Sequence, residues 1–164
     1  IIAKNVVMQA ELQKQWRERG VKKTYLALVK GILEPKKGAI EAGILRSFKD
    51  RRKMSVSLSG KSRQSFTEYE VKKHFNDCSL VYAYPRTGRT HQIRVHFSAI
   101  GHPIIGDSLY GDKSLNKRFE RRFGLRRQFL HAIELEIAHP ATLKRITFKS
   151  PLAQDLDNVI ARLA

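Results

Sequence analysis

Residues 87–96 concentrate side chains whose types and spacing could do chemistry. The polar side chains of this segment are those of Thr87, Arg89, Thr90, His91, Gln92, Arg94 and His96. A guanidinium group can hold a carboxylate or a phosphate with two parallel hydrogen bonds. If residues 92–96 are helical, Gln92 and His96 share one side and Arg94 points elsewhere, so one segment can serve both a core and a site. A solvated basic turn is the alternative, but this density of donors beside Gly88, in a strongly basic chain, favours a site for a carboxylate or a polyanion.

The charge of the chain points in the same direction. It has 32 lysines and arginines against 15 acidic residues, a net charge of +17 and a pI near 10.4. Such an excess attracts polyanions, and nucleic acid is the first candidate. An anionic membrane is the second, but the sequence shows no basic amphipathic helix with large apolar residues and no apolar run of spanning length. We therefore expect an RNA partner and no membrane.

Length and composition predict one packed domain that covers residues 1–164. The 41% of hydrophobic residues is enough for a core, and no linker, repeat or low-complexity tract interrupts the chain. The single cysteine, Cys78, excludes an internal disulfide and is expected to be a small buried side chain in a reduced, cytoplasmic protein. The histidines show no ligand spacing, so we expect no metal. No serine has the context of a hydrolase nucleophile.

Alternating apolar residues predict strands around the candidate site. In the strand expected over residues 23–30, Tyr25 shares a face with Ala27 and Val29, and Leu26 and Leu28 occupy the other face. Further strands are expected at residues 54–58, 65–73, 78–84, 129–138 and 144–148. The glycine- and proline-punctuated residues 31–52 are expected to form a loop.

Helices are expected at both ends of the chain and between the strands. Residues 6–19 are expected to bury a stripe of Met8, Leu12 and Trp16; a base-stacking role for Trp16 is the alternative. A second helix, capped by Ser114, repeats apolar residues every four positions, and residues 155–163 form a third. The predicted fold class is α+β, with a mixed or antiparallel sheet carrying short helices.

Two basic clusters outside the central segment are candidates for contact with a phosphate backbone. The first follows the expected loop and the second lies on the helix after Ser114. Their residues are Arg51, Arg52 and Lys53, and Arg118, Arg121 and Arg122. A solvated face is the alternative for each cluster.

The central segment resembles the signature of the RluA-type pseudouridine synthases of RNA. The resemblance rests on Thr87-Gly88-Arg89-Thr90-His91-Gln92-Ile93-Arg94, followed by Gly101-His102-Pro103-Ile104-Ile105-Gly106-Asp107 and by Tyr110-Gly111. Further matches, in the same order as in the family, lie at residues 23–31, 52–56, Gly60-Lys61, 67–69, 130–132 and His139-Pro140. Together they cover nearly the whole chain.

The resemblance implies a pseudouridine synthase-like catalytic domain that isomerises a uridine in ribosomal or transfer RNA, without cofactor or metal. It implies that Tyr25 stacks on the uracil and that Arg94 pairs with the catalytic carboxylate. Arg89 would contact RNA phosphate or brace its loop, and His91 and Gln92 would support the site. Leu130 would pack beneath the base.

One feature of the family is missing from the sequence. The family's nucleophilic aspartate lies in a His-Arg-Leu-Asp motif, a few residues before a stretch resembling residues 1–5. No such motif occurs here, and no aspartate has a matching neighbourhood. We expect an N-terminally incomplete catalytic domain that is inactive alone, within an active whole protein. A non-catalytic basic RNA-binding module is the alternative.

Asp107 is the tempting substitute for the missing aspartate. It lies between glycine-rich turns, and a carboxylate in such a place commonly accepts backbone N–H bonds. We therefore expect Asp107 to shape the loop.

Overall fold

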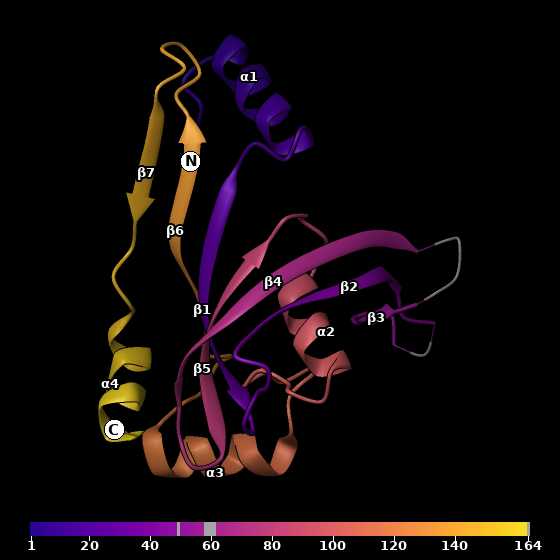
Figure 1. Cartoon of the computed structure of the whole chain (residues 1–164), viewed down its shortest axis with the longest axis vertical. Helices are drawn as coiled ribbons and strands as arrows, with labels where there is room; N and C mark the ends of the chain where they lie inside the picture. Colours follow the sequence, from indigo (N-terminus) through magenta and orange to yellow (C-terminus); the bar gives the residue numbers. More distant parts are fainter. Residues whose placement is uncertain (49, 58–61, 164) are drawn as a thin grey trace.

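The computed structural model of the chain describes residues 1–48, 50–57 and 62–163, so Leu58 of an expected strand and the Gly60-Lys61 pair lie outside the described residues. Within these ranges, seven strands form one sheet in the order β3-β2-β4-β5-β1-β6-β7, with every neighbouring pair antiparallel. The strands are β1 (Lys22–Lys30), β2 (Lys37–Arg46), β3 (Met54–Val56), β4 (Arg63–His74), β5 (Cys78–Pro85), β6 (Leu130–Ala138) and β7 (Arg145–Lys149). The helices are α1 (Val6–Arg17), α2 (Gln92–Ala99), α3 (Lys113–Phe123) and α4 (Gln154–Leu163) (Figure 1). The predicted α+β class with an antiparallel sheet is confirmed.

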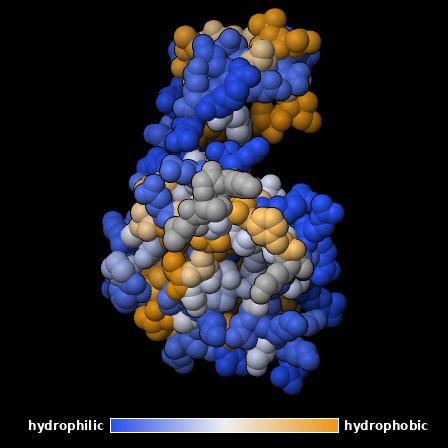
Figure 2. Space-filling model, turned by 90° about the vertical axis from the view of Figure 1, so that its right-hand side faces the viewer, coloured by the Kyte–Doolittle hydropathy of each residue, from blue (hydrophilic) through white to orange (hydrophobic). Residues whose placement is uncertain are grey.

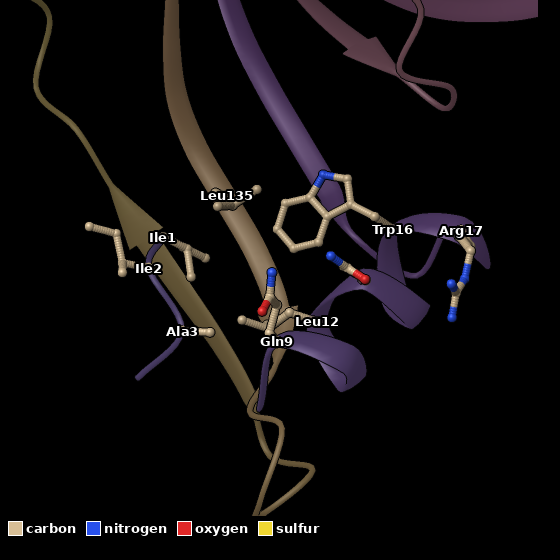
Figure 3. A pocket seen from close by; sticks show the side chains of 9 residues that line it. Ile1, Ile2, Ala3, Gln9, Leu12, Trp16, Arg17 and Leu135 are labelled. Carbon is tan, nitrogen blue, oxygen red and sulfur yellow. The ribbon is translucent and has the colours of Figure 1, made fainter. Parts of the chain in front are cut away.

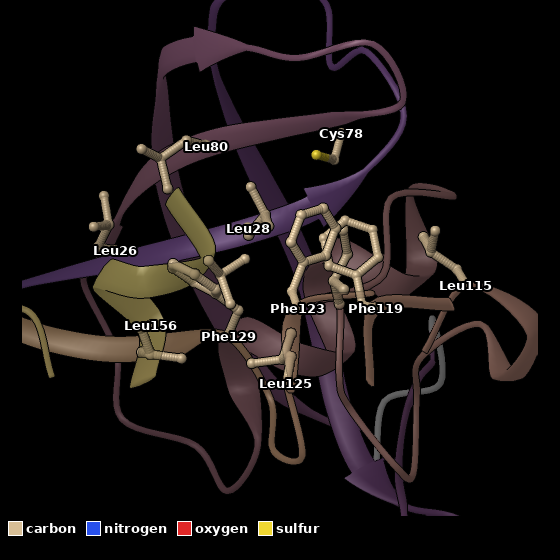
Figure 4. Close-up of a cluster of buried hydrophobic side chains, with 12 residues drawn as sticks. Leu26, Leu28, Cys78, Leu80, Leu115, Phe119, Phe123, Leu125, Phe129 and Leu156 are labelled. Atoms are coloured by element: carbon tan, nitrogen blue, oxygen red, sulfur yellow. The ribbon is translucent and has the colours of Figure 1, made fainter. Parts of the chain in front are cut away.

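The central part of the sheet separates two cores, and β1 contributes to both. One core contains Leu26, Leu28, Cys78, Leu80, Phe119, Phe123, Phe129 and Leu156 (Figure 4). The other contains Ala27, Val29, Leu33, Ile40, Tyr69, Ile93, Phe97 and Ile104. The predicted alternation along β1 is therefore confirmed, and it places α3 and α4 on one face of the sheet and α2 on the opposite face.

The prediction of a loop over residues 31–52 is wrong, because residues 37–46 form β2. Its glycines are strand residues with a packing role. Gly38 pairs with Tyr69 of β4, and a Cβ atom at Gly38 would lie 2.6 Å from the Tyr69 hydroxyl oxygen. Glycine is required there because an aromatic side chain packs directly over the backbone of its neighbouring strand.

The prediction of a buried stripe on α1 is also wrong. No residue of α1 is buried, and Trp16 is 43% exposed. Polar hydrogen bonds attach this helix to the sheet. The Gln15 amide donates through Nε2 to the Ala138 carbonyl at 2.8 Å and accepts through Oε1 from the Ala138 N–H at 2.9 Å.

An open apolar hollow lies where the stripe of α1 faces the sheet. Figure 3 shows Leu12 and Trp16 around it, together with Ile1 and Leu135. Figure 2 shows the narrow upper part of the molecule with hydrophobic colour gathered at its edge. The apolar spacing of α1 is thus real, but within the described residues no element covers it.

Asp112, not Ser114, caps α3. Its carboxylate oxygen Oδ1 accepts a hydrogen bond from the Leu115 N–H at 2.9 Å. The apolar residues at four-residue spacing, Leu115, Phe119 and Phe123, are buried, as their spacing predicted. Among the described helices, none is long and apolar enough to cross a membrane.

Candidate active site

A cavity of about 350 Å³ opens between β1, β6 and the turn that joins β5 to α2. We call it the Tyr25–Arg94 cavity. The side chains singled out in the sequence that line it are Tyr25, Arg89, His91, Gln92, Arg94 and Leu130. Residues more than a hundred positions apart in the chain thus meet at one place, because β1 pairs with both β5 and β6.

Two neighbouring strands supply the tyrosine and the apolar wall of the cavity. The register between β1 and β6 shifts between Thr24 and Tyr25, and such a bulge changes the direction of a side chain. Leu130 is paired with Ala27 at the start of β6 and lines the same cavity. Burial raises the pKa of the Tyr25 phenol, which is therefore protonated at neutral pH.

Gln92 fixes the turn that precedes α2. Its Oε1 accepts hydrogen bonds from the Thr87 hydroxyl at 2.7 Å and from the Arg89 N–H at 3.0 Å. Its Nε2 donates to the Phe66 carbonyl and the Thr67 hydroxyl, both at 3.0 Å. Because these bonds use all four hydrogen-bonding positions of the amide, Gln92 is a structural residue that ties the turn to β4.

The Tyr110 ring lies over the guanidinium of Arg94 and contacts the ring of His91. His91 has left-handed backbone angles (φ 57°, ψ 18°), and its Nδ1 lies 3.0 Å from the Tyr110 hydroxyl. That hydroxyl also accepts from the Met54 N–H at 2.7 Å. The Tyr110 ring is thereby held with its centroid 4.9 Å from Cζ of Arg94, a distance typical of a cation–π contact. Burial, with the Arg94 charge, lowers the pKa of His91 and favours its neutral form.

Arg94 forms a two-point ion pair with Asp107. Nε and Nη2 of the arginine each lie 2.7 Å from a carboxylate oxygen, and the side-chain exposures are 10% and 0%. Asp107 also accepts from the N–H groups of Leu109 and Tyr110, at 2.9 and 3.1 Å. Asp107 therefore shapes its loop through backbone hydrogen bonds, as expected, and also holds Arg94.

The Arg94–Asp107 pair is electrostatically stable despite its burial. Burial opposes ionisation of Asp107, but the hydrogen bonds from Arg94 and the backbone outweigh it and lower the carboxyl pKa. The hydrogen bond to Asp107 raises the pKa of Arg94. The pairing of Arg94 with Asp107 was not predicted from the sequence. The sequence did contain a signal for it, because an arginine that lies in a helix beside apolar residues is buried and needs a carboxylate partner.

The two basic clusters lie outside the Tyr25–Arg94 cavity. Between β2 and β3, Arg52 makes an exposed two-point pair with Asp50, both bonds at 3.1 Å. Arg51 is exposed and Lys53 half-buried in the same turn. The cluster on α3, Arg118, Arg121 and Arg122, is exposed on the helix that packs against the opposite face of the sheet from α2. Lys23, which the sequence did not single out as a site residue, also lines the cavity.

Comparison with known proteins gives the family. A family model described as RNA pseudouridylate synthase matches residues 1–99. Ribosomal large subunit pseudouridine synthase C of Haemophilus ducreyi is 35% identical over 163 residues, which are 99% of this chain and 51% of that protein. Ribosomal large subunit pseudouridine synthase D of Nitrosomonas europaea is 41% identical over 157 residues, covering 95% and 45% of the two chains. The chain thus spans about half the length of these relatives.

Solved structures agree with the sequence relatives. Human RNA Pseudouridylate Synthase Domain Containing 1 superposes with a TM-score of 0.79 at 33% identity, over 96% of this chain and 66% of that one. Human RNA Pseudouridylate Synthase Domain Containing 4 gives a TM-score of 0.78 at 26% identity, over 97% and 68%. The chain therefore belongs to the RNA pseudouridylate synthase family, as its resemblance to the RluA-type enzymes predicted.

Proposed function

We propose that the whole protein to which this chain belongs isomerises uridines of RNA to pseudouridine, with ribosomal RNA as the substrate class. Its relatives that are ribosomal large subunit pseudouridine synthases support ribosomal RNA. Transfer RNA is the alternative substrate, and the proposal includes a cytoplasmic location. One observation carries the assignment of the site: Tyr25, Arg94 and Leu130 line the same cavity.

The cavity has the composition that a flipped uracil needs. Extrusion of a base costs a few kcal/mol of stacking, which contacts inside a pocket must offset. In the proposal, the Tyr25 ring stacks on the uracil and Leu130 packs against it, while the protonated phenol lies near the ring edge. The glycosidic bond from the ribose to the uracil nitrogen breaks, the base rotates, and a ring carbon of the uracil bonds to the ribose. That carbon loses its proton, and the released nitrogen gains one.

The nucleophile in this proposal is a carboxylate from another part of the whole protein. Asp107 is unsuited to the role, because it is fully buried and already accepts hydrogen bonds from Arg94 and two backbone N–H groups. Asp107 occupies Nε and Nη2 of Arg94, whereas Nη1 has no hydrogen-bond partner among the described residues. Arg94 is thus oriented on one edge and retains donors for the incoming carboxylate, whose ionised form a guanidinium stabilises.

The test uses the whole protein and transcripts of ribosomal and transfer RNA, with pseudouridine measured by mass spectrometry. We expect Arg94→Ala to abolish product and Tyr25→Phe to lower turnover by at least about tenfold, a loss typical of a missing general-acid or base contact. Ile32→Ala, at an exposed side chain away from the cavity, is the control and should keep full activity.

Two outcomes would overturn the proposal. Normal turnover by Arg94→Ala would show that the guanidinium of Arg94 has no role in the reaction. A whole protein that binds RNA but forms no pseudouridine in either RNA class would favour a non-catalytic RNA-binding module.

A further inference from the structure

Two cations that line the Tyr25–Arg94 cavity are not neutralised within the described part of the chain. Lys23 and Arg89 both line the cavity, and among the described residues neither forms an ion pair with a carboxylate. Other basic residues near this turn are neutralised: Arg86 pairs with Glu68 at 2.6 Å and Arg94 pairs with Asp107. The charges of Lys23 and Arg89 are therefore available to an anion from outside the chain.

Lys23 is the more informative of the two because its ammonium group is partly buried. Burial lowers its pKa, so the folded protein gives up hydration of this charge. Its Nζ donates one long hydrogen bond, 3.3 Å, to the Thr87 carbonyl oxygen. An ammonium group has three donors, and within the described part of the chain the remaining two have no protein acceptor. An unpaired, half-buried cation is costly unless an anion completes it.

A second hollow continues from the cavity towards the end of α1. It has a volume of about 330 Å³ and shares Trp16, Lys23, Thr87, Gly88 and Arg89 with the Tyr25–Arg94 cavity. Its remaining lining residues are Arg17, Arg19, Val21 and Arg86. Among the described residues that line the two hollows, none is acidic. The two hollows therefore adjoin and form a basic channel, with Lys23 and Arg89 in the wall that they share.

We propose that Lys23 and Arg89 together bind one backbone phosphate of the RNA strand, next to the nucleotide whose base enters the Tyr25–Arg94 cavity. This subsite rests on the proposed function for its ligand. A phosphate carries one negative charge and accepts hydrogen bonds from both side chains at once. Holding the strand beside the flipped nucleotide fixes where the ribose lies relative to the catalytic groups.

The experiment compares Lys23→Gln with Lys22→Gln in the whole protein. Lys22 is the adjacent residue on β1, is largely exposed and pairs with Glu136 at 3.1 Å. Both variants lose one charge, so any difference between them is local. The probe is a fluorescein-labelled, uridine-rich single-stranded RNA, with affinity measured by anisotropy over a range of potassium chloride concentrations. One phosphate contact on a single strand contributes about 0.7 to the slope of log K against log salt. We expect Lys23→Gln to reduce the magnitude of this slope by about that amount and Lys22→Gln to leave it unchanged.

Two further variants test the chemistry of the subsite. Lys23→Arg keeps the cation and should retain the slope of the unmodified protein. If Lys23 and Arg89 hold the same phosphate, the double variant Lys23→Gln/Arg89→Gln should lose less than the sum of the two single variants. Thermal unfolding of each variant confirms that it is folded. If the loss in the double variant equals the sum of the losses in the two single variants, Lys23 and Arg89 do not bind the same phosphate.

Failure of the subsite differs from failure of the isomerase proposal. If Lys23→Gln and Lys22→Gln give equal slopes of log K against log salt and pseudouridine is still formed, the phosphate subsite is wrong and the isomerase proposal stands. If only Lys23→Gln changes the slope and no RNA contains pseudouridine, the channel binds RNA but the isomerase proposal is wrong.

Discussion

Arginine–carboxylate pairs of the same geometry occur in this protein in two different environments. Arg94 meets Asp107 through Nε and Nη2, both at 2.7 Å, and Arg127 meets Asp155 through the same atoms at 2.7 and 2.8 Å. The first pair is almost completely buried, and the side chains of the second are 45% and 52% exposed. A buried charge that loses its partner cannot be rehydrated, whereas an exposed one can. Burial therefore separates a structural ion pair from a surface contact.

We predict that Asp107→Asn lowers the free energy of unfolding by at least about 3 kcal/mol, because it leaves the buried guanidinium of Arg94 uncompensated. Urea denaturation followed by circular dichroism measures this change. Asp155→Asn is the matched control, and its cost should stay below about 1 kcal/mol. Equal losses for the two substitutions would show that burial is irrelevant to the Arg94–Asp107 pair.

At the scale of elements, the sequence predicted most strands and helices but failed where packing decides. Alternation located β1 and β5, since their side chains face two different cores, and β4, whose Tyr69 and Val71 face one of them. It missed β2 because glycine in a sequence indicates a turn, whereas in the structure Gly38 leaves room for the Tyr69 side chain. It also predicted burial of Trp16, because periodicity shows that a helix has an apolar stripe but not whether another element covers it.

His96 connects α2 with β4 and, through Ser65, with β2. Its ring is fully buried, and its Nε2 lies 2.8 Å from the Ser65 hydroxyl, which itself donates to the Ala42 carbonyl at 2.5 Å. Because the hydroxyl hydrogen is used, the imidazole donates through Nε2–H, and its Nδ1 has no partner among the described residues. Burial lowers the pKa of His96 below its ordinary value.

We predict that His96 makes the fold sensitive to mild acid. A histidine with a lowered pKa in the folded state binds its proton more readily when unfolded, so its contribution to stability is complete above about pH 6.5 and falls as the pH drops towards the folded pKa. The loss should not exceed about 1.4 kcal/mol per pH unit for one proton. Unfolding free energies from urea titrations, measured on both sides of this range, give the slope.

The comparison is His96→Gln, whose amide keeps a donor near the position of Nε2 but does not titrate. It should flatten the dependence of stability on pH. Parallel profiles for the two proteins would mean that other groups, among them His91, account for the acid sensitivity.

At the scale of the whole molecule, the basic residues lie on both sides of the sheet. The Tyr25–Arg94 cavity lies on the side of α2, while the arginines of α3 lie on the helix that packs against the opposite face. Sequence spacing identified both groups of residues, since charge and motif are local properties. It could not show that they are separated, because that follows from the order of strands in the sheet. An RNA must therefore pass around the molecule to touch both surfaces.

This separation predicts that the contribution of α3 depends on the length of the RNA. The triple variant Arg118→Gln/Arg121→Gln/Arg122→Gln should bind a short single strand that fills the cavity as tightly as the unmodified protein, apart from the change in overall charge. It should bind a long folded ribosomal transcript more weakly, with the magnitude of the slope of log K against log salt reduced by up to about 2.7, since each of the three lost duplex phosphate contacts contributes about 0.9. Pseudouridine formation at saturating RNA should be unchanged, because none of the three residues lines the cavity.

The matched control removes three positive charges elsewhere, at the edge of β1, β6 and β7. The variant Lys22→Gln/Arg145→Gln/Lys149→Gln changes residues that already pair with Glu134 or Glu136. It has the same net charge as the α3 variant, so it reports the effect of the overall field alone. If both triple variants weaken binding of the long transcript equally, α3 makes no local contact and the charge of the molecule acts only at a distance. A selective loss in the α3 variant means that the transcript reaches the face of the sheet opposite the Tyr25–Arg94 cavity.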